Sequence, residues 1–234
     1  MNWSVPRMWE GGDVWIIGGG PSVYREFEIP KEIVDSVLKG TSPLSVYSPF
    51  MKGLHDKHVI GVNAAYMLGD WIDIVFFGDS GFFMQHKRDL AMFAGLKVSC
   101  HNGARGEHWV KFLGRDGSKA RGISSAPSLV SWNGNSGAAA ISIAAHSGAR
   151  RIMLLGFDMK LNGENRQHWH DVYHRGAINT RDDRKMRKLP FNRHLRGFDA
   201  IAADAQKMGI EIINCNPDSA ITQFPKVSTK LLLG

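Results

Sequence analysis

The stretch VWIIGGGPSV, residues 14–23, places an apolar run directly before three glycines, a proline and a serine. A short apolar run that stops at such residues is typical of a buried parallel strand followed by a tight turn. Glycines in such a turn let a phosphate or a sugar approach the backbone, and the N–H groups that enter the next helix bind anions. The alternative is a tight turn with no ligand, and the glycines alone do not decide between the two.

Further apolar runs repeat this pattern along the chain. They are HVIGV (58–62), IDIVFF (72–77), KVSC (97–100), RIMLLG (151–156) and IEIIN (210–214). Helical patterns lie between them, most clearly over residues 136–146 and 198–208, each followed by a glycine that signals a helix end. Strands that alternate with helices predict a single α/β domain over residues 1–234, with a Rossmann-like, doubly wound and mainly parallel sheet.

Small or hydrogen-bonding residues follow most of the predicted strands or open a helix. They are Gly18, Gly19, Gly20, Pro21, Ser22, Asn63, Gly78, Asp79, Ser80, Asn135, Ser136, Asp158 and the turn from Asn216 to Ser219. Ligands bind beyond the carboxyl ends of parallel strands, so we expect these residues to form one nucleotide site. The turn has neither a Walker GK[ST] ending nor a complete G-x-G-x-x-G, which disfavours chemistry that depends on NAD.

A polar, basic segment from about residue 159 to 197 has no clear periodicity, and we interpret it as a lid over the site. Its cations include Arg181, Arg184, Lys185, Arg187, Lys188, Arg193 and Arg196. We expect the lid to become ordered over a bound phosphate. The alternative is a charged face that only contacts solvent.

The formal net charge of +7 favours a polyanionic partner such as a nucleotide, a nucleic acid or an acidic glycan. No zinc finger, RNA-binding signature or helix-turn-helix supports specific reading of a nucleic acid. We expect no membrane span and no signal peptide, because neither an apolar run of about 18 residues nor a basic and apolar leader occurs. Cys100 and Cys215 have no metal or redox spacing, which fits a cytoplasmic protein.

Six short motifs occur in an order that resembles a known family. They are the Gly-x-Gly-Pro-Ser of the first turn, Gly61-Val62-Asn63, Asn135-Ser136-Gly137, RIMLLGFD (151–158), His194 five residues before Asp199, and Asn216-Pro217-Asp218-Ser219. The series resembles the small bacterial sialyltransferases that use CMP-sialic acid. It is also similar to related, often phage-borne proteins akin to 6-hydroxymethylpterin diphosphokinase, and a phage-encoded chain would work in the host cytoplasm.

The resemblance implies that these motifs, Gly137 and Ser219 included, bind the donor, that no metal is required, and that His194 is the catalytic base. Three departures predict a donor other than CMP-sialic acid. Gly19 replaces an asparagine of the family, Met159-Lys160 replaces an aromatic residue after Gly-x-Asp, and Tyr173 is the one plausible substitute for the tyrosines that hold the donor phosphate.

A cluster of three histidines, His168, His170 and His174, precedes or flanks Tyr173. His170 and His174 share a face on a helix, whereas His168 and His170 share one on an extended segment. Three interpretations stay open for them. With Asp158, the first two could hold a divalent ion; the cluster could donate hydrogen bonds to a phosphate; or it could pack on Trp169 within a polar lid.

Our leading hypothesis is a glycosyltransferase that moves a sugar from a nucleotide-sugar donor to an acceptor hydroxyl, on DNA or a glycan. Asp79 and Asp158 would bind sugar or ribose hydroxyls, and Asp158 would serve catalysis together with His194, whose alternative is a surface histidine in a basic run. One alternative is an ATP-dependent pyrophosphokinase-like transferase with Mg²⁺ on Asp79 or Asp158. The other is a non-catalytic protein that binds a nucleotide sugar or a nucleic acid.

Overall fold

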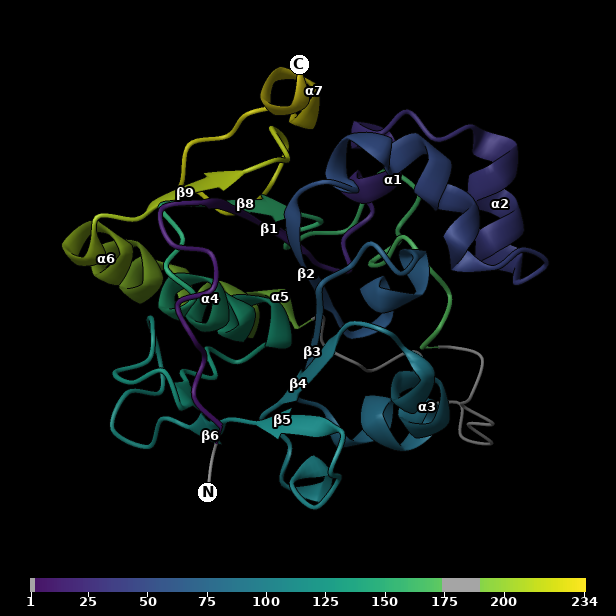
Figure 1. Ribbon diagram of the computed structural model, residues 1–234. Helices are drawn as coiled ribbons and strands as arrows, with labels where there is room; N and C mark the ends of the chain where they lie inside the picture. Colours follow the sequence, from purple (N-terminus) through teal and green to yellow (C-terminus); the bar gives the residue numbers. More distant parts are fainter. Residues whose placement is uncertain (1–2, 174–189) are drawn as a thin grey trace.

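The computed structural model describes residues 3–173 and 190–234. Its centre is a seven-stranded sheet in which every pair of neighbouring strands is parallel (Figure 1). The order across the sheet is β5-β4-β3-β2-β1-β8-β9. The strands are β1 (Asp13–Ile17), β2 (His58–Val62), β3 (Ile74–Phe77), β4 (Leu96–Ser99), β5 (Val110–Phe112), β8 (Arg151–Leu155) and β9 (Glu211–Asn214). The predicted Rossmann-like, mainly parallel α/β fold is confirmed.

The direction of winding reverses between β1 and β8. The chain builds the sheet outward from β1 to β5, then returns to add β8 and β9 on the other side of β1. Such a reversal opens a crevice beyond the strand ends, where ligands of doubly wound sheets bind. The turn that follows β1 and the end of β8 therefore meet at the topological switch point.

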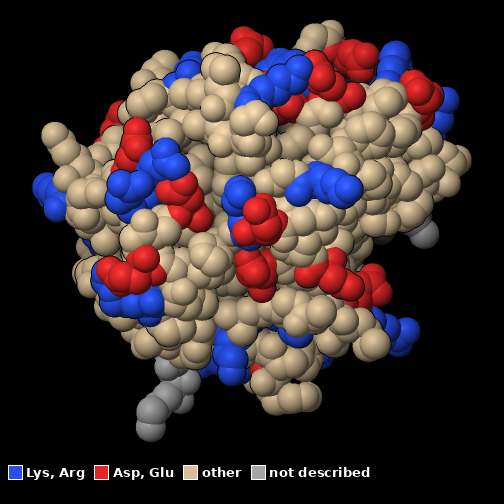
Figure 2. All heavy atoms as spheres, turned by 45° about the horizontal axis from the view of Figure 1, so that its top comes forward, with Lys and Arg blue, Asp and Glu red and all other residues tan. Residues whose placement is uncertain are grey.

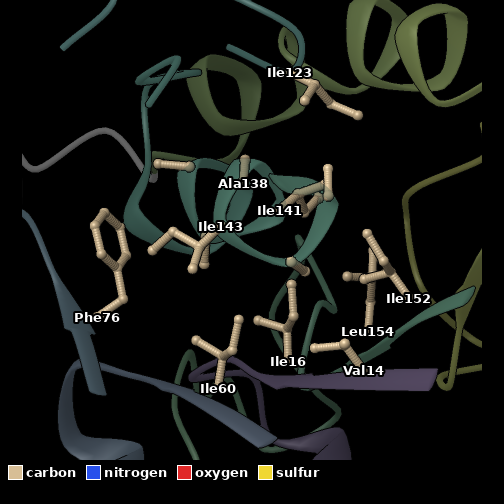
Figure 3. Close-up of a cluster of buried hydrophobic side chains, with 14 of the residues drawn as sticks. Val14, Ile16, Ile60, Phe76, Ile123, Ala138, Ile141, Ile143, Ile152 and Leu154 are labelled. Carbon is tan, nitrogen blue, oxygen red and sulfur yellow. The ribbon is translucent and has the colours of Figure 1, made fainter. Parts of the chain in front are cut away.

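The core consists of two apolar layers, one on each face of the sheet. Successive residues of β1 alternate between them: Val14 and Ile16 join one layer, and Trp15 and Ile17 join the other. Figure 3 shows Val14 and Ile16 pointing toward Ile141 of α4 (Ser136–His146). Both faces are covered, which explains why the strands are continuously apolar in sequence.

Helices α4 and α6 cover the first face, and α2, η1 and α3 cover the second (Figure 1). The helical elements are α1 (Ser22–Glu26), α2 (Lys31–Lys39), η1 (Leu44–Leu54), η2 (Asn63–Leu68), α3 (Ser80–Met92), η3 (Asn102–Ala104), α5 (Phe191–Leu195), α6 (Phe198–Met208) and α7 (Thr229–Leu233). Two short strands, β6 (Gly114–Arg115) and β7 (Leu129–Val130), pair with each other beside the main sheet.

The segment predicted as a lid is partly outside the described residues. Residues 159–173 form irregular backbone with turns, and α5 gives the end of the segment a short helix that the sequence analysis did not expect. No helix in residues 3–173 and 190–234 is long and apolar enough to cross a membrane.

The basic charge of the chain is concentrated in one stretch. Residues 174–189, outside the described part, contain six Lys or Arg and two Asp, a net of +4 out of the +7 of the chain. On the face drawn in Figure 2, blue and red side chains are interspersed and no continuous basic field occurs. The charge argument for a polyanionic partner therefore depends mainly on that stretch.

Candidate active site

A cavity of about 680 Å³ lies beyond the carboxyl ends of β1, β2, β3 and β8, at the switch point. It combines many of the residues that the sequence analysis singled out. The predicted residues that line it are Gly18, Gly19, Gly20, Asn63, Asp79, Asn135, Ser136, Gly137, Asp158, His168, Tyr173 and His194. The strand ends at which the sequence predicts a site thus border a cavity of the size that holds a small-molecule ligand.

The three glycines after β1 are each required by another part of the chain. A Cβ on Gly18 would lie 2.8 Å from the main-chain oxygen of Gly156, and one on Gly19 would lie 2.8 Å from Nδ1 of His168. A Cβ on Gly20 would lie 1.9 Å from Oδ2 of Asp158. These contacts are enough to explain why the turn carries no side chains, and no ligand is needed for that explanation.

Asp158 is buried and faces the start of α1. Its Oδ1 accepts a hydrogen bond from the backbone nitrogen of Ser22 at 3.0 Å, and its Oδ2 accepts one from Ser22 Oγ at 2.7 Å. Burial raises the pKa of the Asp158 carboxyl, although both hydrogen bonds act in the opposite direction. This carboxylate therefore holds the glycine turn in place, a role that sequence reasoning did not assign to it.

Three predicted donor residues do not line the large cavity. Pro21 and Ser22 line a smaller cavity of about 260 Å³ that also borders Asp158. Ser219 is buried, and its Oγ donates to the main-chain oxygen of Phe157 at 2.6 Å. The late turn therefore fastens the chain after β9 to the end of β8.

Asn63 and Tyr173 meet at one wall of the cavity. The Asn63 backbone has φ of 51°, in the left-handed region that asparagine tolerates better than most residues. Its Nδ2 donates to the Tyr173 hydroxyl at 3.1 Å. Burial raises the pKa of that hydroxyl, so it stays protonated near neutrality and can donate a hydrogen bond.

His168 and His170 lie on irregular backbone with bends, and their side chains lie side by side. Their rings stack with centroids 5.4 Å apart, and each makes an edge contact with Tyr173. The Nδ1 of His170 accepts from the backbone nitrogen of Val172 at 3.3 Å. Within the described residues, no group of three or more His, Cys, Asp or Glu is arranged to hold a metal ion.

The amino end of α4 forms another part of the wall. Asn135 caps this helix, because its Oδ1 accepts from the backbone nitrogen of Ala138 at 2.8 Å. Ser136 Oγ donates to Oδ2 of Asp79, an exposed residue that follows β3, at 3.0 Å. The positive end of the helix dipole and a carboxylate therefore face the same space.

His194 lies on α5 beside that wall, half-buried. Nδ2 of Asn135 donates to its main-chain oxygen at 3.4 Å, and Arg193 contacts its Nε2 at 3.3 Å. Burial and then the charge of Arg193 lower the pKa of His194 to about 4, while Asp79 acts in the opposite direction. Its imidazole is therefore neutral at pH 7.

Asp199 does not support His194 directly. The carboxylate is exposed and accepts a hydrogen bond from Nε2 of Gln223 at 2.9 Å. The five-residue spacing spans the junction between α5 and α6, so it does not bring the two side chains together. Of the remaining predicted lid residues, His174, Arg181 and Arg184 lie outside the described residues.

The sequence analysis missed an aromatic part of the cavity. Phe82, Trp132 and Phe191 line it, and the guanidinium of Arg115 stacks over the Trp132 ring at 4.0 Å from its centroid. A Cβ on Gly78 would lie 2.4 Å from that ring. The signal available in sequence was Trp132 three positions before the cap of α4.

No family model and no curated protein sequence matches the chain. Among solved structures, the MAf glycosyltransferase of Magnetospirillum magneticum AMB-1 has a similar fold, with a TM-score of 0.57 and 13% identity. That match covers 98% of this chain and 36% of the other, so this chain spans about a third of that protein. The sialyltransferase CstII of Campylobacter jejuni, solved with cytidine-5'-monophosphate, matches with a TM-score of 0.49 and 14% identity over 94% of this chain and 86% of the other.

Proposed function

We propose that this chain is a glycosyltransferase that uses a nucleotide-sugar donor. The observation that carries the proposal is the shared wall of the cavity, where Asn135 caps α4 and also bonds to the backbone of His194. A helix end suited to a phosphate and a neutral imidazole thereby lie side by side. The fold that this chain shares with a glycosyltransferase supports the proposal.

In the proposed reaction, the donor phosphate lies at the amino end of α4. The backbone nitrogens of Ser136 and Gly137 lie in the first turn of that helix, where N–H groups have no partner within the helix. They would stabilise the charge that develops on the phosphate oxygen as the bond to the anomeric carbon breaks. The electron pair of that bond leaves with the phosphate.

His194 would take the proton of the acceptor hydroxyl while its oxygen bonds to the anomeric carbon. The low pKa of His194 keeps the ring unprotonated at neutral pH, so it is ready to accept a proton. Asp79, exposed at the cavity, would bind hydroxyls of the sugar. We assign to Asp158 a structural role, which is to hold the glycine turn in its conformation.

The assay has two stages. A thermal-shift screen of nucleotides and nucleotide sugars, beginning with cytidine nucleotides, identifies the donor because a ligand of the native state raises the unfolding temperature. Transfer of sugar from that donor is then measured with and without EDTA. Stabilisation without turnover would indicate a binding protein, and turnover of ATP that requires Mg²⁺, with no sugar transferred, would indicate a pyrophosphokinase.

The glycosyltransferase proposal predicts that His194→Ala keeps donor binding and loses about 10²- to 10⁴-fold in transfer rate. Full activity of this variant would refute the assignment of the base. Activity lost instead in His168 or His170 variants, and restored by added metal, would move the chemistry to that cluster.

A further inference from the structure

Arg193 and His194 are consecutive residues of α5, and both line the large cavity. A terminal guanidinium nitrogen of Arg193 lies 3.3 Å from Nε2 of His194. A guanidinium has only donors, so Nε2 must be the acceptor in this contact. The proton of the neutral imidazole is therefore on Nδ1, and one cation fixes the tautomer of its neighbour.

The contact with Arg193 limits how well His194 can act as a base. A general base needs a free lone pair within reach of the proton that it removes. In the free protein, the lone pair of Nε2 is occupied by Arg193, and the adjacent positive charge also makes His194 harder to protonate. His194 is thus covered and weakened as a base by the residue beside it.

Arg193 is free to leave this position. Its side chain is exposed, and no ion pair within the described residues involves it. A phosphate is a stronger partner for a guanidinium than a neutral imidazole is, because both members are charged and two hydrogen bonds can form. The cap of α4, at which a phosphate is proposed to lie, is bonded to the backbone of the same short helix.

We propose that Arg193 covers His194 in the free protein and moves to the donor phosphate when a nucleotide sugar binds. The inference rests on the proposed function, since it needs a phosphate in this cavity and a base at His194. Binding of the donor then uncovers Nε2 and removes a cation from its side. The other groups of the described chain that face His194 are Asp79, after β3, and the neutral Asn135 of α4.

The test uses nuclear magnetic resonance of the full chain with ¹⁵N-labelled histidine, in which His194→Gln identifies the signals. Inorganic pyrophosphate is the probe. Arg193→Met removes the charge and the donors, and Arg196→Met, on an exposed arginine at the end of the same helix and outside the cavity, is the matched control. We expect the Nδ1–H tautomer in the wild type and the control, and a shift toward Nε2–H together with a raised pKa in Arg193→Met.

Pyrophosphate should raise the pKa of His194 in the wild type and in the control. In Arg193→Met, its affinity should fall about tenfold, the size expected for one charge-assisted hydrogen bond at an exposed side chain, and the pKa should no longer respond in the same way. The same tautomer and pKa in Arg193→Met as in the wild type would overturn the proposal. Equal pyrophosphate affinity in the two variants, or no effect of pyrophosphate on His194 in the wild type, would also overturn it.

A kinetic readout separates this inference from the proposed function. The acid limb of kcat, which reports the donor complex, should lie at higher pH than the limb of kcat/KM, and the two should approach each other in Arg193→Met. Transfer activity with an unchanged His194 tautomer would refute the cover by Arg193 alone. A chain that transfers no sugar from any donor would refute the proposed function, whatever the tautomer of His194.

Discussion

Ser22 donates two hydrogen bonds to Asp158, from its backbone nitrogen at 3.0 Å and from its Oγ at 2.7 Å. The pair joins the turn after β1 to the end of β8 across the switch point of the sheet. Gly20 lies in this turn with no room for a side chain. These hydrogen bonds make the glycine turn part of the folded framework. A substitution in the turn is therefore expected to lower the stability of the fold.

Gly20→Ala should therefore destabilise the fold rather than only block the donor. Its Cβ would lie 1.9 Å from Oδ2 of Asp158, and overpacking of this kind costs about 1–3 kcal/mol. Gly81→Ala is the matched control, because Gly81 also borders the cavity and its Cβ would meet nothing within 4 Å. Urea unfolding measures both. Equal stability of the two variants would contradict the framework role of Gly20.

Asn135→Ser should separate the two contacts of this residue. Serine is as good a helix cap as asparagine, so the fold should keep its stability to within about 0.5 kcal/mol. The shorter side chain cannot donate to the main-chain oxygen of His194, and a displaced base should slow transfer by about 10- to 100-fold. Asn135→Ala, which also loses the cap, should in addition cost about 1 kcal/mol. Unchanged kcat in the serine variant would show that the contact with His194 is dispensable.

The pH dependence of kcat/KM should report His194 in the free protein. The base must be unprotonated, and its pKa is lowered to about 4, so the rate should fall only as the pH falls through that region. An ordinary histidine would instead give a limb near its usual value of about 6.5. His194→Ala should lack the limb, and His58→Gln, at an exposed histidine, should retain it. A limb near 6.5 in the wild type would mean that His194 is not buried as described.

Asp116 provides a prediction about stability in acid. Burial alone would raise the pKa of this carboxyl, but five hydrogen bonds from Ser118, Lys119 and Ser125 hold it below its ordinary value. A lowered pKa in the folded state stabilises the fold above the unfolded value of about 3.9, and that contribution is lost as the pH falls below it.

Asp116→Asn should thus cost about 2–3 kcal/mol at pH 7 and less at pH 3, as measured by urea unfolding. The exposed Asp199→Asn is the control and should change little at either pH. A cost for Asp116→Asn that is the same at both pH values would contradict the role of its charge.

Sequence patterns predicted the elements whose apolar residues recur regularly. The strand at 58–62 and the helices at 136–146 and 198–208 have the predicted bounds, because continuous apolar or helical periodicity marks them. The strand at 110–112 was missed, since it has three residues and its central Lys111 is exposed. Short edge elements owe their form to the neighbour with which they pair, and local sequence does not show that neighbour.

The site was predicted in its position and not in its internal contacts. The convergence of Asn63, Asp79 and Asn135 follows from parallel strands, whose ends meet at one edge. The need for a glycine at position 20 does not follow from the sequence pattern, because the atom that excludes a side chain there belongs to Asp158, far away in the sequence.

The winding order also sets when during synthesis the cavity can exist. Strands β1 to β5 emerge in the order in which they lie side by side, so five of the seven strands can assemble as the chain leaves the ribosome. One edge of β1 stays unpaired until β8 is synthesised. Ser22 likewise has no hydrogen bond to Asp158, which lies 136 positions downstream, until then. Non-local pairing of this kind slows folding. A nascent chain that stops before β8 therefore has the glycine turn but no cavity. A ligand of the cavity can bind and stabilise only the nearly complete polypeptide.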